Sequence, residues 1–90
     1  MRERDIEASL TKAIQKKKGL SFKWVSPGQA GVPDRIIILP GGRIIFVELK
    51  APTGRASSLQ EYQIARLRSL GCDVRVIKGQ KDLEVMLSEI

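Results

Sequence analysis

The chain has 90 residues, and its hydrophobic content of 42% suits one folded domain, residues 1–90, rather than a disordered segment. Sixteen Lys and Arg residues against ten Asp and Glu residues give a net charge of +6, which favours a polyanionic partner, nucleic acid above all. Histidine is absent and Cys72 is the single cysteine, which excludes a disulfide framework, a His-activated nucleophile and a Cys or His zinc site within one chain.

The first predicted element is a helix over Glu3 to Lys17. Apolar residues recur at every fourth position through this segment, and Gly19 ends it after a run of lysines. A half-buried strand is predicted over Leu20 to Val25, because Leu20, Phe22 and Trp24 alternate with polar residues. We expect the aromatic residues of this strand, with Tyr62 further along the chain, to lie in the core.

Two apolar segments, Arg35 to Leu39 and Arg43 to Leu49, give the strongest strand signals. Both are apolar on both faces, which is typical of central strands with cover on each side. The intervening Pro40-Gly41-Gly42 is typical of a hairpin loop. These two strands are therefore predicted to form an antiparallel pair at the centre of a sheet.

The second half of the chain predicts a helix, a strand and a last short helix. Ser57 and Ser58 each offer a helix N-cap, and Ser58 with Glu61 fits a capping box. The order α-β-β-β-α-β-α predicts an α/β fold with a mixed central sheet flanked by helices. The expected bounds are a helix that ends at Leu70, a strand from Asp73 to Ile77 and a helix from Asp82 to Glu89.

The length of the hairpin loop decides which side chains meet. If Pro40-Gly41-Gly42 is a three-residue loop, Leu39 faces Arg43 and the two residue numbers of every cross-strand pair add up to 82. Asp34 then lies opposite Glu48. Glu48 and Lys50 then project from the same face of their strand. A two-residue Gly41-Gly42 loop would shift the register by one and turn Asp34 to the other face. The sequence leaves both loops open.

Two carboxylates that face each other across strands repel, and a shared divalent cation removes the conflict. Without histidine and with one cysteine, such a cation should be hard and bound by oxygen, as Mg²⁺ or Mn²⁺ is. It would polarise a phosphoryl oxygen and activate water, while basic residues hold the polyanion. Taken alone, Glu48-Leu49-Lys50 is usually an exposed ion pair and Pro33-Asp34 usually a turn, so the prediction depends on their combination.

The chain resembles the PD-(D/E)XK nucleases, and within them the VRR-NUC, or virus-type replication and repair nuclease, branch. The resemblance covers nearly the whole chain and extends to the α-β-β-β-α-β order. It rests on three segments, Gly31-Val32-Pro33-Asp34, Glu48-Leu49-Lys50 and Ser57-Ser58-Leu59-Gln60.

The resemblance implies a DNA endonuclease that depends on Mg²⁺ or Mn²⁺. By that resemblance Asp34, Glu48 and the carbonyl of Leu49 would bind the metal, and Lys50 would orient or deprotonate the attacking water. Glu7 would be a further acidic ligand, favoured over Glu3 because it adjoins Ile6 of the apolar stripe. Gln60 would position the substrate or the lysine, and Gln63 is a weaker candidate for that role.

The resemblance also implies partners. Stand-alone members resemble Holliday junction resolvases, so we expect branched duplex DNA as substrate and a C2 homodimer. Such small domains resemble phage proteins, and the absence of a signal core or of about 18 successive apolar residues predicts a cytoplasmic protein with no membrane partner. We expect no nucleotide cofactor. The basic residues expected to contact DNA are Arg55, tested first, with Arg35, Lys16, Lys17 and Lys18.

Two other hypotheses about the function remain open. A non-catalytic nucleic-acid-binding module on the same scaffold would gain nothing from carboxylates that face phosphate. A structural or interaction protein would bind neither metal nor DNA. Cleavage assays distinguish both from a nuclease.

Overall fold

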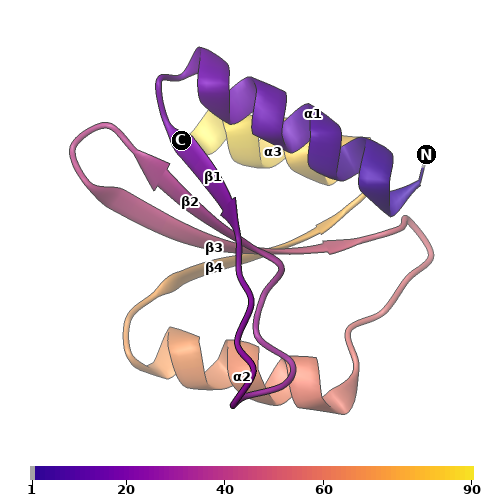
Figure 1. The fold of residues 1–90 in the computed structure, drawn as a ribbon. Coiled ribbons are helices and arrows are strands. Elements are labelled where there is room, and N and C mark those ends of the chain that lie inside the picture. Colours follow the sequence, from indigo (N-terminus) through magenta and orange to yellow (C-terminus); the bar gives the residue numbers. More distant parts are fainter. Residues whose placement is uncertain (1) are drawn as a thin grey trace.

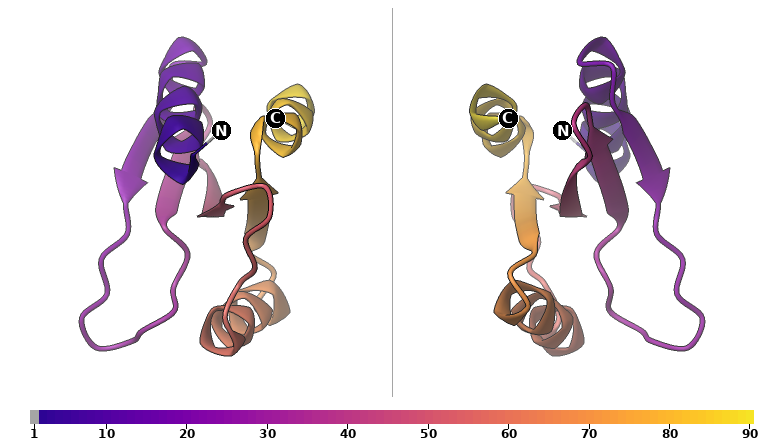
Figure 2. Two further views of the ribbon diagram at one scale, coloured as in Figure 1. Left: turned by 90° about the vertical axis from the view of Figure 1, so that its right-hand side faces the viewer. Right: turned by 90° about the vertical axis from the view of Figure 1, so that its left-hand side faces the viewer.

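The computed structural model describes residues 2–90, so only Met1 of the expected domain lies outside it. The four strands form one mixed sheet in the order β1-β2-β3-β4, antiparallel except for the β3–β4 pair. Helices α1 and α3 cover one face of this sheet and α2 lies against the other (Figures 1 and 2). The predicted α/β fold is confirmed. The elements are α1 (Glu3–Lys16), β1 (Leu20–Lys23), β2 (Arg35–Leu39), β3 (Arg43–Lys50), α2 (Ser58–Ser69), β4 (Asp73–Lys78) and α3 (Gln80–Glu89).

The β2–β3 hairpin has the three-residue loop. Leu39 pairs with Arg43, and the Gly42 amide donates to the Leu39 carbonyl at 3.0 Å. Gly41 and Gly42 both have positive φ, 88° and 80°, which an L residue adopts only with strain. Paired positions therefore sum to 82, and the two-residue alternative is excluded. This register puts Asp34 on the same face as Glu48.

The main core lies between the sheet and the α1–α3 layer. The apolar stripe of α1 is fully buried there, with alternate residues of β2 and β3 and the inner face of α3. Burying that stripe is what holds α1 on the sheet, since a helix of this length is marginal alone. The core residues are Ile6, Leu10, Ile14, Ile37, Leu39, Ile45, Val47, Leu49, Ile77, Leu83 and Met86.

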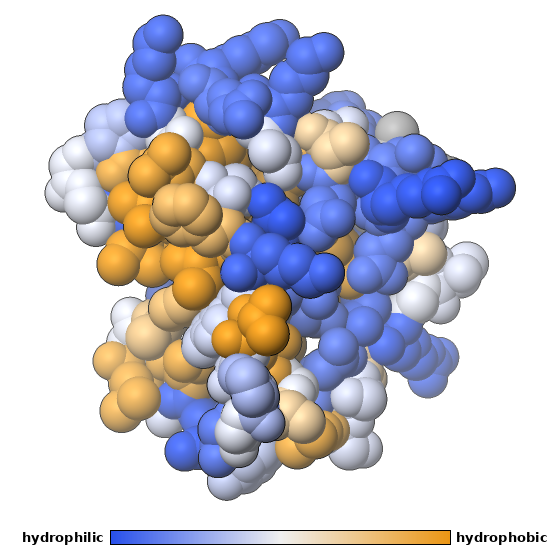
Figure 3. Space-filling model, in the orientation of Figure 1, coloured by the Kyte–Doolittle hydropathy of each residue, from blue (hydrophilic) through white to orange (hydrophobic). Residues whose placement is uncertain are grey.

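The opposite face of the sheet is only partly covered, because α2 packs over β3 and β4 and leaves β1 open. Leu20 and Phe22 are therefore 54% and 50% exposed. The expectation that the apolar side of β1 points inward is wrong, and Tyr62, on α2, is exposed as well. In Figure 3 apolar side chains gather on the left of the view, at the level of the sheet and down toward α2. No helix of residues 2–90 is long and apolar enough to cross a membrane.

Candidate active site

A buried carboxylate, Glu48, is the centre of the site. Glu48 lies near the end of β3, beside Val76 of β4, and is fully buried. One carboxylate oxygen, Oε2, accepts from Lys50 Nζ at 2.9 Å and from Gln60 Nε2 at 2.8 Å. The other, Oε1, is fully buried and has no hydrogen-bond partner. Burying a carboxylate oxygen without a hydrogen-bond partner is costly, so we expect a cation or a water molecule to contact Oε1.

Gln60 is held in place by the start of α2. The Ser57 amide donates to Gln60 Oε1 at 2.8 Å, and the Gln60 amide donates to Ser57 Oγ at 3.1 Å. This reciprocal capping box fixes the amide oxygen of Gln60 and so turns its NH₂ group toward Glu48. The predicted box of Ser58 and Glu61 is wrong, because Ser57 is the N-cap.

Gln63 lies one turn further along α2 but serves a different region. Its Nε2 donates to the Ala30 carbonyl at 3.1 Å and to Gln29 Oε1 at 3.3 Å. It therefore holds the loop before β2 against α2. The structure gives this glutamine no contact with Glu48.

Asp34 extends the pairing of β2 with β3 by a side-chain bond. Its Oδ2 accepts from the Leu49 amide at 2.8 Å, while its carbonyl accepts from the Trp24 amide at 2.9 Å. The carboxylate is thus fixed at the edge of β3 where the backbone ladder of β2 has ended. In a strand the N–H and C=O of one residue point to the same side, so the Leu49 carbonyl also points toward Asp34.

The charges of the cluster perturb one another. Burial raises the pKa of Glu48 and the nearby charge of Asp34 raises it further, although the Lys50 ammonium opposes both effects. Burial lowers the pKa of Lys50, but the bond to Glu48 and the surrounding carboxylates outweigh that effect and raise its pKa overall. Lys50 is therefore an ammonium at neutral pH. The site therefore holds two acidic side chains, Asp34 and Glu48, with the Lys50 ammonium beside them.

The residues present fit a hard divalent cation. Mg²⁺ is usually bound by one or two carboxylates, with water and substrate phosphate in the remaining positions. Asp34, Glu48 Oε1 and the Leu49 carbonyl supply that number of oxygen ligands. Within residues 2–90 no group of three or more His, Cys, Asp or Glu side chains is placed to hold a metal, which excludes an all-protein cage.

Glu7 is not brought into this cluster. Its Oε2 pairs with Arg35 Nη1 at 3.4 Å, on the α1 side of the sheet. The α1 carboxylate whose charge raises the pKa of Glu48 is Glu3. The structure thus places Glu7 with Arg35 at the start of β2, and its role as a metal ligand stays a prediction. Periodicity placed Glu7 near the core but gave no sign of that partner.

Arg35 lies in a network of structural contacts. Its side chain is 13% exposed, and its guanidinium donates to Glu7, to Thr11 Oγ1 and to both the Oγ and the carbonyl of Ser21. These contacts link β2, β1 and α1. Four of its five N–H groups are used in these contacts, which leaves little of the guanidinium for a phosphate, and its role in DNA binding stays a prediction.

The other residues predicted to contact DNA differ in their distance from the active site. Arg55 is exposed and lines a groove next to the site, whereas Lys17 lines a hollow with Arg43 and Pro40 at the hairpin end of the sheet. Arg43 to Glu48 spans five residue steps, about 17 Å of strand. Lys16, Lys17 and Lys18 therefore lie too far from Glu48 to contact the scissile phosphate, and they remain candidates for distant backbone contacts.

Comparisons with protein-family models, curated proteins and solved structures agree on one family. The VRR-NUC domain model matches residues 2–81. A protein of Acyrthosiphon pisum secondary endosymbiont phage 1, p44, named as a candidate nuclease, is 44% identical over 90 residues, all of this chain and 96% of that protein. A solved structure described as a VRR-NUC domain superposes with a TM-score of 0.90 at 28% identity, covering 96% of this chain and 94% of that one.

Proposed function

Because the chain belongs to the VRR-NUC family of nucleases, we propose that it is an endonuclease that hydrolyses phosphodiester bonds in DNA with Mg²⁺ or Mn²⁺. The observation that carries the metal dependence is Glu48 Oε1, a buried oxygen without a partner. A hard cation at this atom would satisfy it, with Asp34 and the Leu49 carbonyl as the other protein ligands. When bound, the cation supplies Lewis-acid polarisation of a phosphoryl oxygen.

The protein's own side chains have separate roles in this proposal. Lys50, 2.9 Å from Glu48 Oε2, stabilises negative charge that develops on the phosphate as water attacks. Its raised pKa fits a charge-stabilising ammonium better than a base that removes the proton from water. Gln60 keeps the Glu48 carboxylate in one orientation and is a positioning residue.

The rival, a non-catalytic nucleic-acid-binding module, is disfavoured by the same atoms. A binder that contacts phosphate gains nothing from two carboxylates close to the contact surface. Keeping Glu48 buried and charged also reduces stability, which is a cost that a metal ligand would explain and a surface contact to phosphate would not.

A homodimer is the second part of the proposal. The open face of the sheet carries two apolar rows, Leu20-Ile38-Ile44 and Phe22-Ile36-Phe46, aligned by the strand register. Ile44 is 49% exposed, and exposed apolar rows of this kind mark interaction sites. A second copy on this face would bury them. It would also supply a second active site, which a junction with two strands to cut requires.

The function is tested by incubating the protein with four-way junction, flap, nicked and linear duplex DNA, with and without Mg²⁺ or Mn²⁺. We expect metal-dependent cleavage, with branched DNA cut faster than linear duplex. Lys50→Ala should lose cleavage and keep the fold. Binding without cleavage of any substrate by the wild-type protein would favour the binding module instead.

A further inference from the structure

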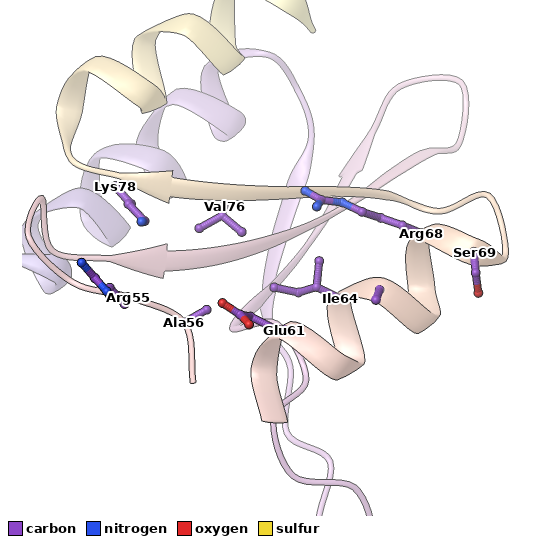
Figure 4. Close-up of a pocket in the computed structure, with 9 residues that line it drawn as sticks. Arg55, Ala56, Glu61, Ile64, Arg68, Ser69, Val76 and Lys78 are labelled. Carbon is purple, nitrogen blue, oxygen red and sulfur yellow. The ribbon is translucent and has the colours of Figure 1, made fainter. Parts of the chain in front are cut away.

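A groove beside the active site has no role in the chemistry described so far. It lies along the seam between α2 and β4 and encloses about 1050 Å³ (Figure 4). Its apolar part is formed by Ile64 of α2 and Val76 of β4, and its rim carries Arg55, Lys78 and Arg68. Glu61 is the one carboxylate among its lining residues, and it points into the groove from α2 (Figure 4).

The rim cations are available to a ligand. Arg55, Lys78 and Arg68 form no ion pair within residues 2–90. Arg68 Nη2 donates to the Val74 carbonyl at 2.8 Å, which fixes its guanidinium along β4 and leaves its other N–H groups free. A fixed guanidinium suits a phosphate, because little side-chain entropy is lost on binding.

The groove begins at the catalytic cluster. Val76 pairs with Glu48 and Lys78 pairs with Lys50 across the β3–β4 ladder, so both lie next to the reacting groups. Arg68 is hydrogen-bonded to the carbonyl of Val74, and the length of β4 from Lys78 to Val74 is about 13 Å. A stacked DNA strand advances about 3.4 Å per nucleotide and an unstacked one advances further, so this length suits two to four nucleotides.

The apolar floor of the groove favours one strand over two. A duplex keeps its bases inside two paired strands, so it can touch the rim cations but cannot lay its bases against a seam between a helix and the strand beneath it. An unpaired strand can place phosphates on the cations and lay its bases and sugars against Ile64 and Val76. Glu61 disfavours phosphate inside the groove and can accept from base amino groups.

We propose that this groove binds a short unpaired stretch, two to four nucleotides long, of the strand that the site cuts. The inference rests on the proposed nuclease function and names its substrate class: DNA with unpaired nucleotides next to the scissile bond. Arg68, Lys78 and Arg55 contact the backbone. Selectivity for branched DNA then arises within one subunit, independently of any second copy.

The binding test uses Asp34→Asn protein without metal, so that no cleavage intervenes. Fluorescence anisotropy measures the Kd of a 12-nucleotide oligo-dT and of a 12-base-pair blunt duplex. The double variant R68A/K78A should weaken oligo-dT binding at least tenfold and duplex binding less than twofold. Removing two phosphate contacts should also reduce the slope of log K against log salt for oligo-dT by about 1.4.

The matched control is R66A/K81A, which removes the same charges elsewhere. Arg66 contacts Gln63 and Tyr62 on another side of α2, and Lys81 is exposed on α3. This control should change neither Kd nor slope. Arg68→Ala also removes the hydrogen bond to the Val74 carbonyl, so Arg68→Lys is measured as a variant that keeps the positive charge. If the charge at this position is what binds DNA, the oligo-dT Kd of Arg68→Lys should lie within about threefold of the wild-type value.

The cleavage test uses forks with zero, two or four unpaired nucleotides at the branch. Wild type should cut the four-nucleotide fork at least tenfold faster than the fully paired one. R68A/K78A should lose that preference, and the control R66A/K81A should keep it. Equal loss of oligo-dT and duplex binding, or no loss of either, overturns the groove inference and leaves the nuclease standing. Absence of cleavage on every substrate overturns the nuclease proposal, while the binding test still decides the groove.

Discussion

Two substitutions of Asp34 separate its structural role from its proposed catalytic one. Asp34 Oδ2 accepts from the Leu49 amide at 2.8 Å, and Leu49 is 1% exposed. In Asp34→Asn the amide oxygen can accept the same hydrogen bond, whereas Asp34→Ala leaves a buried N–H unpaired. Both variants lose the negative charge that a cation needs.

The expected magnitudes differ accordingly. An unpaired buried amide costs about 1–3 kcal/mol, and 1 kcal/mol shifts the Tm of a domain of this size by about 4–8 °C. Asp34→Ala should therefore lower the Tm by about 5 to 20 °C. Asp34→Asn should lower it by less than about 4 °C, because the bond remains and the repulsion that raises the pKa of Glu48 disappears.

Differential scanning fluorimetry with and without Mg²⁺ or Mn²⁺ measures these shifts beside a cleavage assay. A cation at 100 times its Kd adds about 2.7 kcal/mol, so wild type should gain about 10 to 20 °C. Asp34→Asn should gain nothing, and its cleavage rate should fall at least a hundredfold, since metal assistance supplies several kcal/mol of the barrier reduction. Full cleavage by this variant, or an unchanged response to metal, would refute the reasoning.

Three further predictions concern other parts of the molecule. Ile44→Glu puts a charge on the open sheet face and should give a monomer by light scattering, with a Tm that no longer depends on protein concentration; a wild type that is already monomeric at high concentration would contradict the dimer. Gln60→Ala frees the Glu48 carboxylate and should slow cleavage 10- to 100-fold, while Gln63→Ala, the control, should not. Two arginines lower the pKa of Asp73 below its usual 3.8, so its stabilisation is present above that pH and lost as pH falls through the lowered value. Asp73→Asn should cost about 1 kcal/mol in urea unfolding at pH 7, and a difference that persists undiminished at pH 2 would count against the ion pairs.

The hairpin could be predicted from sequence, and its register was narrowed to two loop lengths, of which the structure has the longer. Gly41 and Gly42 supply the positive φ of the loop, and the apolar strands on either side allow few other pairings. The position of Asp34 beside Glu48 follows from that register alone, because side chains alternate along a strand. The most local part of the site was therefore the most predictable.

Contacts between distant segments could not be read from the pattern. Glu7 and Glu3 share a helix face in sequence terms, and only the position of Arg35 across the sheet separates their roles. Periodicity likewise showed the apolar side of β1 but not that α2 stops short of it. Lys78 gave no local signal, since its position beside Lys50 depends on the parallel pairing of β3 with β4.

The central claim is that Asp34 and Glu48 share a divalent cation. Anomalous diffraction from crystals soaked in Mn²⁺ tests it most directly. We predict one anomalous peak within about 2.3 Å of an Asp34 oxygen, of Glu48 Oε1 and of the Leu49 carbonyl. No peak at saturating Mn²⁺, or a peak that touches neither carboxylate, would contradict the claim.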